Sequence, residues 1–166
     1  MRQTLVAALL LTPMLGTAPL CAQESGIAVG ADAPVVVVRD LDGKAVDLGQ
    51  YIGKKPVFLE FWATWCELCE ELLPRVRAAH AAYGDQVEFL GVNVTVNQSR
   101  DRVRRYLEKH RPPFRTLYDE AGTSTRAYEA PATSYVVIVD RSGKIAYTGS
   151  GGTQEFDGVL RRITQN

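Results

Sequence analysis

Apolar residues recur along the chain with two periods, which together predict a domain of mixed α and β structure. Residues 57–62 form a near-continuous apolar run broken only by Glu60, as expected of a central strand covered on both faces. From residue 66 to residue 83, apolar residues recur at helical spacing instead, and Gly84 supplies the stop. We expect Pro74 to kink this helix.

The flanking segments predict further strands and helices. Residues 34–39 and a second brief strand, joined by the turn at Asp42-Gly43, indicate an N-terminal hairpin added to a core. Residues 87–96 are strand-like, and a helix capped by Asn97 or Ser99 reaches His110. The remaining expected elements are a short strand at 114–118, a connector at 119–128, a hairpin of strands 134–139 and 144–148, and a final helix capped by Thr153 that buries Phe156, Val159, Leu160 and Ile163.

This order of elements predicts an α/β fold. Strands that alternate with helices and end in a hairpin and a helix are typical of a three-layer domain, with a mixed central sheet and helices on both faces. The chain has 166 residues, of which 46% are hydrophobic, and this is enough for one compact domain with its own core. The order of elements alone does not identify a function.

The first residues have the three-part layout of a secretory signal. Arg2 precedes an apolar run at 5–15 and small residues at 17–22. We therefore expect a signal peptide at 1–22 and an exported, soluble domain at 23–166, in the periplasm or otherwise outside the cytoplasm. Lipid attachment at Cys21 is less favoured, because Leu20 stands where bacterial lipoproteins have a small residue.

The charge pattern excludes several kinds of partner. Lys+Arg and Asp+Glu both number 19, so the chain has no overall attraction to nucleic acid or to an anionic membrane. Four arginines (Arg100, Arg102, Arg104 and Arg105) lie on one predicted helix, but with Asp101 and Glu108 among them we interpret this as a solvated face. We expect a monomer that binds no nucleic acid.

Two cysteines remain if Cys21 leaves with the signal peptide. Cys66 would lie at the N-terminus of a helix, whose partial positive charge stabilises a thiolate, and Cys69 follows one turn later, close enough to form a disulfide. An exported vicinal dithiol of this kind is typical of a redox couple. The alternatives are a structural disulfide or half of a zinc site, but no second C-x-x-C or paired His follows. We expect no metal and no cofactor.

The string F-W-A-T-W-C-E-L-C, which begins at Phe61, resembles a known family. Together with Pro74 it is similar to the thioredoxin superfamily, in particular to its TlpA/ResA-like exported thiol-disulfide oxidoreductases. The resemblance covers roughly residues 30–164. It implies a thioredoxin-like fold and a Cys66–Cys69 disulfide that is exchanged with disulfides of other proteins.

In that family a cis-proline before a strand packs beside the dithiol and offers backbone to an incoming peptide. Pro131 occupies that place, so the resemblance implies a cis bond there and a substrate-binding role for Pro131 and Thr133. The family commonly has Pro-Thr-Thr-Phe, whereas this chain has Pro-Ala-Thr-Ser-Tyr, so the rim of the substrate groove differs. An ordinary turn proline is the alternative.

Glu60 lies six residues before Cys66, where thioredoxins have a buried Asp and many exported relatives have Asn. A carboxyl group in an apolar strand should have a raised pKa. Our hypothesis is that Glu60 accepts the proton of Cys69 through a bridging water. The alternative is a structural carboxylate with its hydrogen bonds satisfied.

Three residues near the cysteines are expected to tune or guide the chemistry. Glu67 and Leu68 depart from the Gly-Pro and x-Pro pairs usual between the cysteines, and the Glu67 carboxylate should favour the neutral Cys66 thiol and so a reductant. Trp65 is expected to form an exposed apolar rim that docks a partner, or else to be packed, whereas Trp62 is expected in the core.

The predicted function is reduction of client disulfides through Cys66 and Cys69. The resemblance implies cysteine-containing exported clients, such as apocytochrome c in cytochrome c maturation, and a membrane-bound electron donor. Two other functions stay open. A thiol peroxidase of this fold needs Pro and Thr where Leu59 and Ala63 stand, and Cu(I)-delivery proteins of this fold have a wider cysteine spacing and a distal His.

Overall fold

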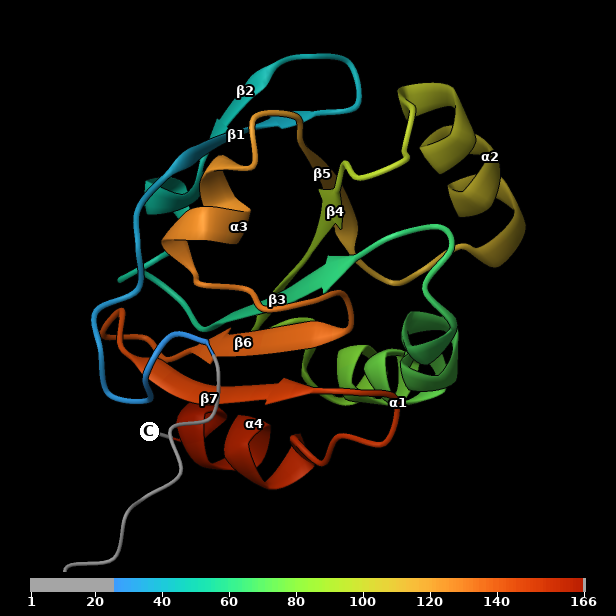
Figure 1. Cartoon of the computed structure of the whole chain (residues 1–166). Helices are drawn as coiled ribbons and strands as arrows, with labels where there is room; N and C mark the ends of the chain where they lie inside the picture. The colour runs from blue at the N-terminus through green and yellow to red at the C-terminus, as the bar shows by residue number, and fades with distance from the viewer. Residues whose placement is uncertain (1–25, 166) are drawn as a thin grey trace, which may run out of the picture.

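The computed structural model describes residues 26–165, which fold around one mixed seven-stranded sheet (Figure 1). The strands are β1 (Val37–Asp40), β2 (Ala45–Asp47), β3 (Val57–Trp62), β4 (Glu88–Val94), β5 (Arg115–Asp119), β6 (Tyr135–Val139) and β7 (Ile145–Ser150). The helices are the 3₁₀ turn η1 (Leu48–Gln50), α1 (Glu67–Tyr83), α2 (Arg100–His110), α3 (Thr123–Ala127) and α4 (Asp157–Thr164). The expected three-layer α/β architecture is confirmed.

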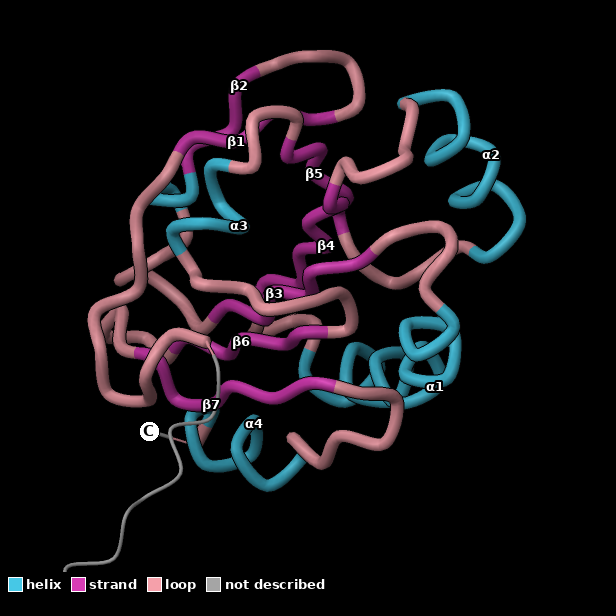
Figure 2. The backbone as a smooth tube through the Cα atoms, in the orientation of Figure 1, coloured by secondary structure: helices cyan, strands magenta, loops and turns pink. Residues whose placement is uncertain are grey.

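The strand order is β2-β1-β5-β4-β3-β6-β7, which places β3 near the middle. The strands β3, β4 and β5 are parallel, and all other pairs are antiparallel. Every residue of β3 is buried, as its continuous apolar run predicts. Because β3 and β4 are parallel, the loops that lead to α1 and α2 leave the same end of the sheet, as Figure 2 shows.

The two faces of the sheet carry separate groups of buried side chains. Phe58 of β3 packs with Leu72 of α1 and Leu160 of α4 on one face, where α1 and α4 lie side by side (Figure 1). Leu59 and the neighbouring odd-numbered residues of β3 pack on the other face, together with residues around α3 and the N-terminal segment. The alternation of side chains along β3 therefore decides which residues point toward α1.

The expected N-terminal hairpin is present, and its position corrects one interpretation of the sequence. Strand β1 pairs with β2 and with β5, so the hairpin extends the sheet. Arg104 donates hydrogen bonds to the carbonyl of Leu41 and to Asp42, while Arg100 donates to the carbonyl of Asp40 and lies over the ring of Tyr118. The interpretation of a merely solvated arginine face was wrong for these two side chains, which attach α2 to the hairpin.

Two predicted element boundaries were also wrong. The expected connector at 119–128 contains α3, because the carboxylate of Asp119 accepts hydrogen bonds from the amides of Ser124 and Thr125 at its first turn. The last helix begins at Asp157 and not after Thr153. Residues before it stay irregular because the buried amide of Gln154 donates to two backbone carbonyls.

The bounds of α1 and the cap of α2 agree with the sequence, and the expected kink at Pro74 stays a prediction. Helix α1 runs without interruption from residue 67 to residue 83 with Pro74 inside it, and Gly84 caps its end. Ser99, one of the two candidate caps, accepts the amide of Arg102 at the start of α2. Leu160 and Ile163 of α4 and Phe156, its N-cap residue, are buried as their spacing predicts, whereas Val159 is only partly buried.

Candidate active site

Cys66 and Cys69 form a disulfide at the start of α1, immediately beyond the buried strand β3. Their Cα atoms are 5.2 Å apart. Cys66 is the N-cap residue, and its Sγ atom accepts a hydrogen bond of 3.1 Å from the amide of Cys69. In the reduced protein this donor and the helix N-terminus would stabilise a Cys66 thiolate.

The side chains between and before the cysteines point to solvent. Trp65 and Leu68 are 48% and 49% exposed, and Glu67 is exposed as well. Trp62, in contrast, is buried against the rings of Tyr106 and Phe114. The structure therefore leaves Trp65 exposed and Trp62 in the core, as the sequence predicts, while the docking role expected of Trp65 stays a prediction.

The segment that contains Pro131 and Thr133 lies at the dithiol end of the sheet. Strand β6 pairs with β3 so that Tyr135 faces Phe61, and the residues just before Tyr135 therefore lie beside those just after Trp62. Pro131 is exposed and Thr133 is half-buried. The end of this segment is fixed by Ser134, whose hydroxyl donates a hydrogen bond to the carbonyl of Gly151.

The expected cis bond at Pro131 was wrong. No peptide bond in the described residues 26–165 is cis. Two residues that flank this segment, Glu129 with φ 50° and Ser134 with φ 60°, lie in the left-handed region.

Glu60 lies beneath this site with only 2% of its surface exposed. It shares the α1-facing side of β3 with Phe58 and Trp62, two residues away on either side. Burial raises its pKa from 4.5 to about 8, as expected for a carboxyl group removed from water. Its Oε2 atom has no hydrogen-bond partner within the described residues, which disagrees with the alternative of a fully satisfied structural carboxylate.

Tyr106 of α2 was missed by the sequence reasoning, although this carboxyl group influences its pKa. Its ring lies between Trp62, at a centroid distance of 5.1 Å, and His110, at 4.1 Å. Burial, and then the nearby negative charges of Glu70 and Glu60, raise the pKa of Tyr106 to about 12. Helical spacing marks Tyr106 as a residue on the packed face of α2 but carries no signal of this electrostatic influence.

The model of one known protein family, described as Redoxin, matches most of the chain, residues 28–161. The chain belongs to the redoxin family. Thiol-disulfide oxidoreductase ResA from Geobacillus thermodenitrificans is 33% identical over 124 residues, which are 74% of this chain and 70% of that protein. ResA from Bacillus subtilis is 30% identical over 135 residues, 81% of this chain and 74% of that protein.

Solved structures confirm the thioredoxin-like fold of this redoxin. The thioredoxin domain of a thiol-disulfide oxidoreductase from Bacteroides vulgatus has a TM-score of 0.71 at 22% identity, covering 82% of this chain and 99% of that one. A putative thiol:disulfide interchange protein DsbE from Chlorobium tepidum has a TM-score of 0.67 at 24% identity, with coverages of 84% and 94%. The resemblance to TlpA/ResA-like proteins of the thioredoxin superfamily is confirmed.

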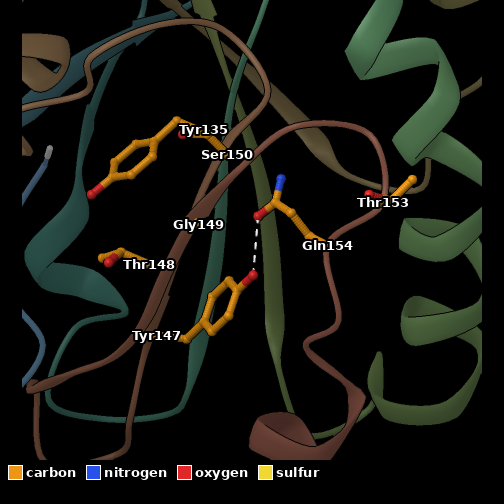
Figure 3. Close-up of a pocket in the computed structure, with 7 residues that line it drawn as sticks. All are labelled: Tyr135, Tyr147, Thr148, Gly149, Ser150, Thr153 and Gln154. Carbon is orange, nitrogen blue, oxygen red and sulfur yellow. Dashed lines mark hydrogen bonds between the residues drawn. The ribbon is translucent and has the colours of Figure 1, made fainter. Parts of the chain in front are cut away.

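The redoxin also has a pocket of about 580 Å³ at the outer edge of β7 (Figure 3). The lining residues are Tyr135, Tyr147, Thr148, Gly149, Ser150, Thr153 and Gln154. Tyr147 donates a hydrogen bond to Gln154, whose amide donates in turn to the carbonyls of Ser134 and Gly151. No cysteine lines this pocket. Its lining residue Gln154 instead fixes the backbone of Ser134, just before β6.

Within residues 26–165, no group of three or more potential ligands could hold a metal ion. In the same range, no helix combines the length and the apolar character needed to cross a membrane.

The raised pKa of Glu60 predicts how stability depends on pH. Between the unfolded pKa of 4.5 and about 8, only the folded protein holds this proton, so each pH unit should lower the free energy of unfolding by up to about 1.4 kcal/mol. Glu60→Gln removes this loss. We expect urea unfolding of the oxidised proteins to show the variant gaining stability relative to wild type from about pH 5 to about pH 8. Parallel pH profiles would contradict the assignment.

Proposed function

We propose that this redoxin is an exported thiol-disulfide oxidoreductase that reduces disulfides in client proteins through Cys66 and Cys69. The observation that carries the proposal is the disulfide between these residues at the N-cap of α1. The relatives named thiol-disulfide oxidoreductase ResA support it, because they share the family and align over most of both chains. A purely structural disulfide would not require this helix N-terminus.

The reaction begins with the reduced protein. The Cys66 thiolate attacks one sulfur of the client disulfide, a bond forms between Cys66 Sγ and that sulfur, and the other client sulfur leaves as a thiolate. The Cys69 thiolate then attacks Cys66 Sγ and displaces the second client thiolate. The client gains two electrons, and the protein is left with the Cys66–Cys69 disulfide seen in the structure.

Glu60 supplies the proton acceptor for the second step in this proposal. Cys69 must lose its proton before it attacks, and Glu60 is a buried carboxyl group on the side of β3 that faces α1. A pKa of about 8 lies close to ordinary working pH, as is favourable for a group that both takes and returns a proton. A bridging water would connect the two groups.

The side chain of Glu67 favours electron flow from this protein to the client. Its carboxylate is exposed on the first turn of α1, adjacent in sequence to Cys66. Negative charge there opposes the effect of the helix N-terminus and makes the reduced thiolate less stable. A dithiol whose reduced form is less stabilised is the better reductant.

The resemblance to TlpA/ResA-like proteins supports a proposal for the clients, and the layout of the first residues supports one for the cell compartment. We propose cysteine-containing exported clients, including apocytochrome c, with electrons returned by a membrane-bound donor. The signal peptide at 1–22 lies outside the described residues, and we propose that it is removed. The exported chain should then begin at Gln23 and not at a lipid-modified Cys21. An intact mass measurement checks this.

Single cysteine variants test the order of the two steps. We expect Cys69→Ser to accumulate a covalent adduct with a disulfide-bearing client such as insulin, because Cys66 attacks and nothing resolves the product. Cys66→Ser should form no adduct, and both variants should lose turnover. Mass spectrometry of the trapped species identifies the linked cysteine. An adduct on Cys69 alone would reverse the roles, and peroxide consumption or Cu(I) retention without disulfide reduction would support the alternative functions.

A second variant tests the proton acceptor. Glu60→Gln keeps the size of the side chain but cannot accept the proton, so we expect release of the mixed disulfide to slow by about 10²-fold, the low end of general-base effects. The first attack should change little. Stopped-flow measurement of both steps across a pH series separates them, and unchanged rates for both would leave Glu60 without this role.

A further inference from the structure

The loop between β4 and α2 is joined directly to the loop that carries the dithiol. The indole Nε1 of Trp65 donates a hydrogen bond of 2.9 Å to the carbonyl of Val96. The amide of Thr64 donates one of 3.0 Å to Oε1 of Gln98. Both loops leave the same end of the sheet (Figure 2), so residues some thirty positions apart in sequence form one surface beside Cys66.

Gln98 connects this surface to the core. Its Oε1 also accepts a hydrogen bond of 3.3 Å from Nδ2 of Asn93, which is fully buried on β4 and contacts the carbonyl of Trp62 as well. The hydroxyl of Tyr118 donates to the backbone carbonyl of Gln98. The Oε1 atom of Gln98 therefore binds the amide of Thr64, just before Trp65, and the side chain of Asn93 at the same time.

The surface is apolar at its centre. Trp65, Leu68 and Val96 are 48%, 49% and 59% exposed. They are three of the six large apolar side chains that are exposed in the described residues, and the other three (Val29, Val35 and Val37) belong to the N-terminal segment and β1. Exposed apolar groups beside a reactive pair are typical of a binding surface.

The charges on the α1 side of this surface are acidic, whereas the cation bonded to the β4–α2 loop beside Val96 is Arg102, which is exposed and donates a hydrogen bond to the carbonyl of Asn97. Glu67 and Glu70 are exposed on the first turn of α1 and Glu71 follows directly after it, and none of the three forms an ion pair within residues 26–165. Their spacings of three and four residues place like charges side by side, which is unfavourable on an isolated helix. A cationic side chain of a partner would relieve this repulsion.

We propose that Trp65, Leu68 and Val96 form a client surface that binds a polypeptide segment whose cystine is flanked by an apolar and a cationic residue. Gln98 is the positioning residue that fixes this surface. The inference rests on the proposed function, since the client must reach Cys66 to be reduced. It adds the chemistry that selects among clients.

Two matched disulfide peptides test the preference of the client surface. One has Leu and Lys beside its cysteine, the other has Ser and Glu, and 2-hydroxyethyl disulfide serves as a small substrate without flanking residues. We expect the reduced wild-type protein to reduce the Leu-Lys peptide about tenfold faster than the Ser-Glu peptide, a difference of about 1.4 kcal/mol. Equal rates for the two peptides would overturn the inference.

Variants of Gln98 test its positioning role. Gln98→Ala should lower the rate with the Leu-Lys peptide about fivefold relative to the rate with 2-hydroxyethyl disulfide, because a hydrogen-bonded anchor is lost. It should also increase acrylamide quenching of Trp65, since Trp62 is buried. Gln98→Glu keeps an acceptor for Thr64 and Asn93 and should restore the rate ratio. An equal fall on both substrates, or no fall, would overturn the role of Gln98.

A second pair of variants keeps the test decisive if Gln98→Ala does not fold. Val96→Ser should lower the same rate ratio, while Val35→Ser, an equally exposed valine on the N-terminal segment, should leave it unchanged. Matching ratios in these two variants would contradict the client surface. Failure of the wild-type protein to reduce 2-hydroxyethyl disulfide would count against the proposed function itself and is distinguishable from these outcomes.

Discussion

The amide of Cys69 donates a hydrogen bond to the sulfur of Cys66, and this bond places a cysteine sulfur at the N-terminus of α1. The position depends on β3, which is buried along its whole length and delivers the chain to the end of the sheet where α1 begins. Phe61 of the same strand pairs with Tyr135 of the antiparallel strand β6, and this pairing brings the segment with Pro131 to the same end of the sheet. The redox pair, its rim and its neighbouring loops are therefore consequences of one strand–helix junction.

A buried acid below this junction is costly for the fold, and the role in proton transfer that we propose for it would offset that cost. Glu60 has an oxygen without a partner within the described residues, and burial raises the pKa of its carboxyl group to about 8. An apolar residue in its place would fit the pattern of β3 better. Such a local conflict in an otherwise consistent strand is characteristic of a functional position.

The sequence predicted the parts that depend on neighbours in the chain. The apolar run of β3, the helical spacing of α1 and the cap at Ser99 are local signals, and the C-x-x-C pair is a local motif.

The features that the sequence did not predict depend on distant residues. The five-residue helix α3 is too short for a periodic signal and begins only because Asp119 accepts its amides. The roles of Arg100, Arg104 and Gln98 exist only once the hairpin and the β4–α2 loop are in place.

The reduction potential of Cys66 and Cys69 tests most directly whether this redox couple is set to donate electrons. Equilibrating the protein with dithiothreitol at fixed ratios of its reduced and oxidised forms, and counting free thiols by alkylation and mass spectrometry, gives the reduction potential of the pair. The effect of Glu67 predicts a potential in the reducing range, below about −200 mV and toward the value of about −270 mV typical of thioredoxin. A potential near about −120 mV, typical of a strong dithiol oxidase, would contradict the account.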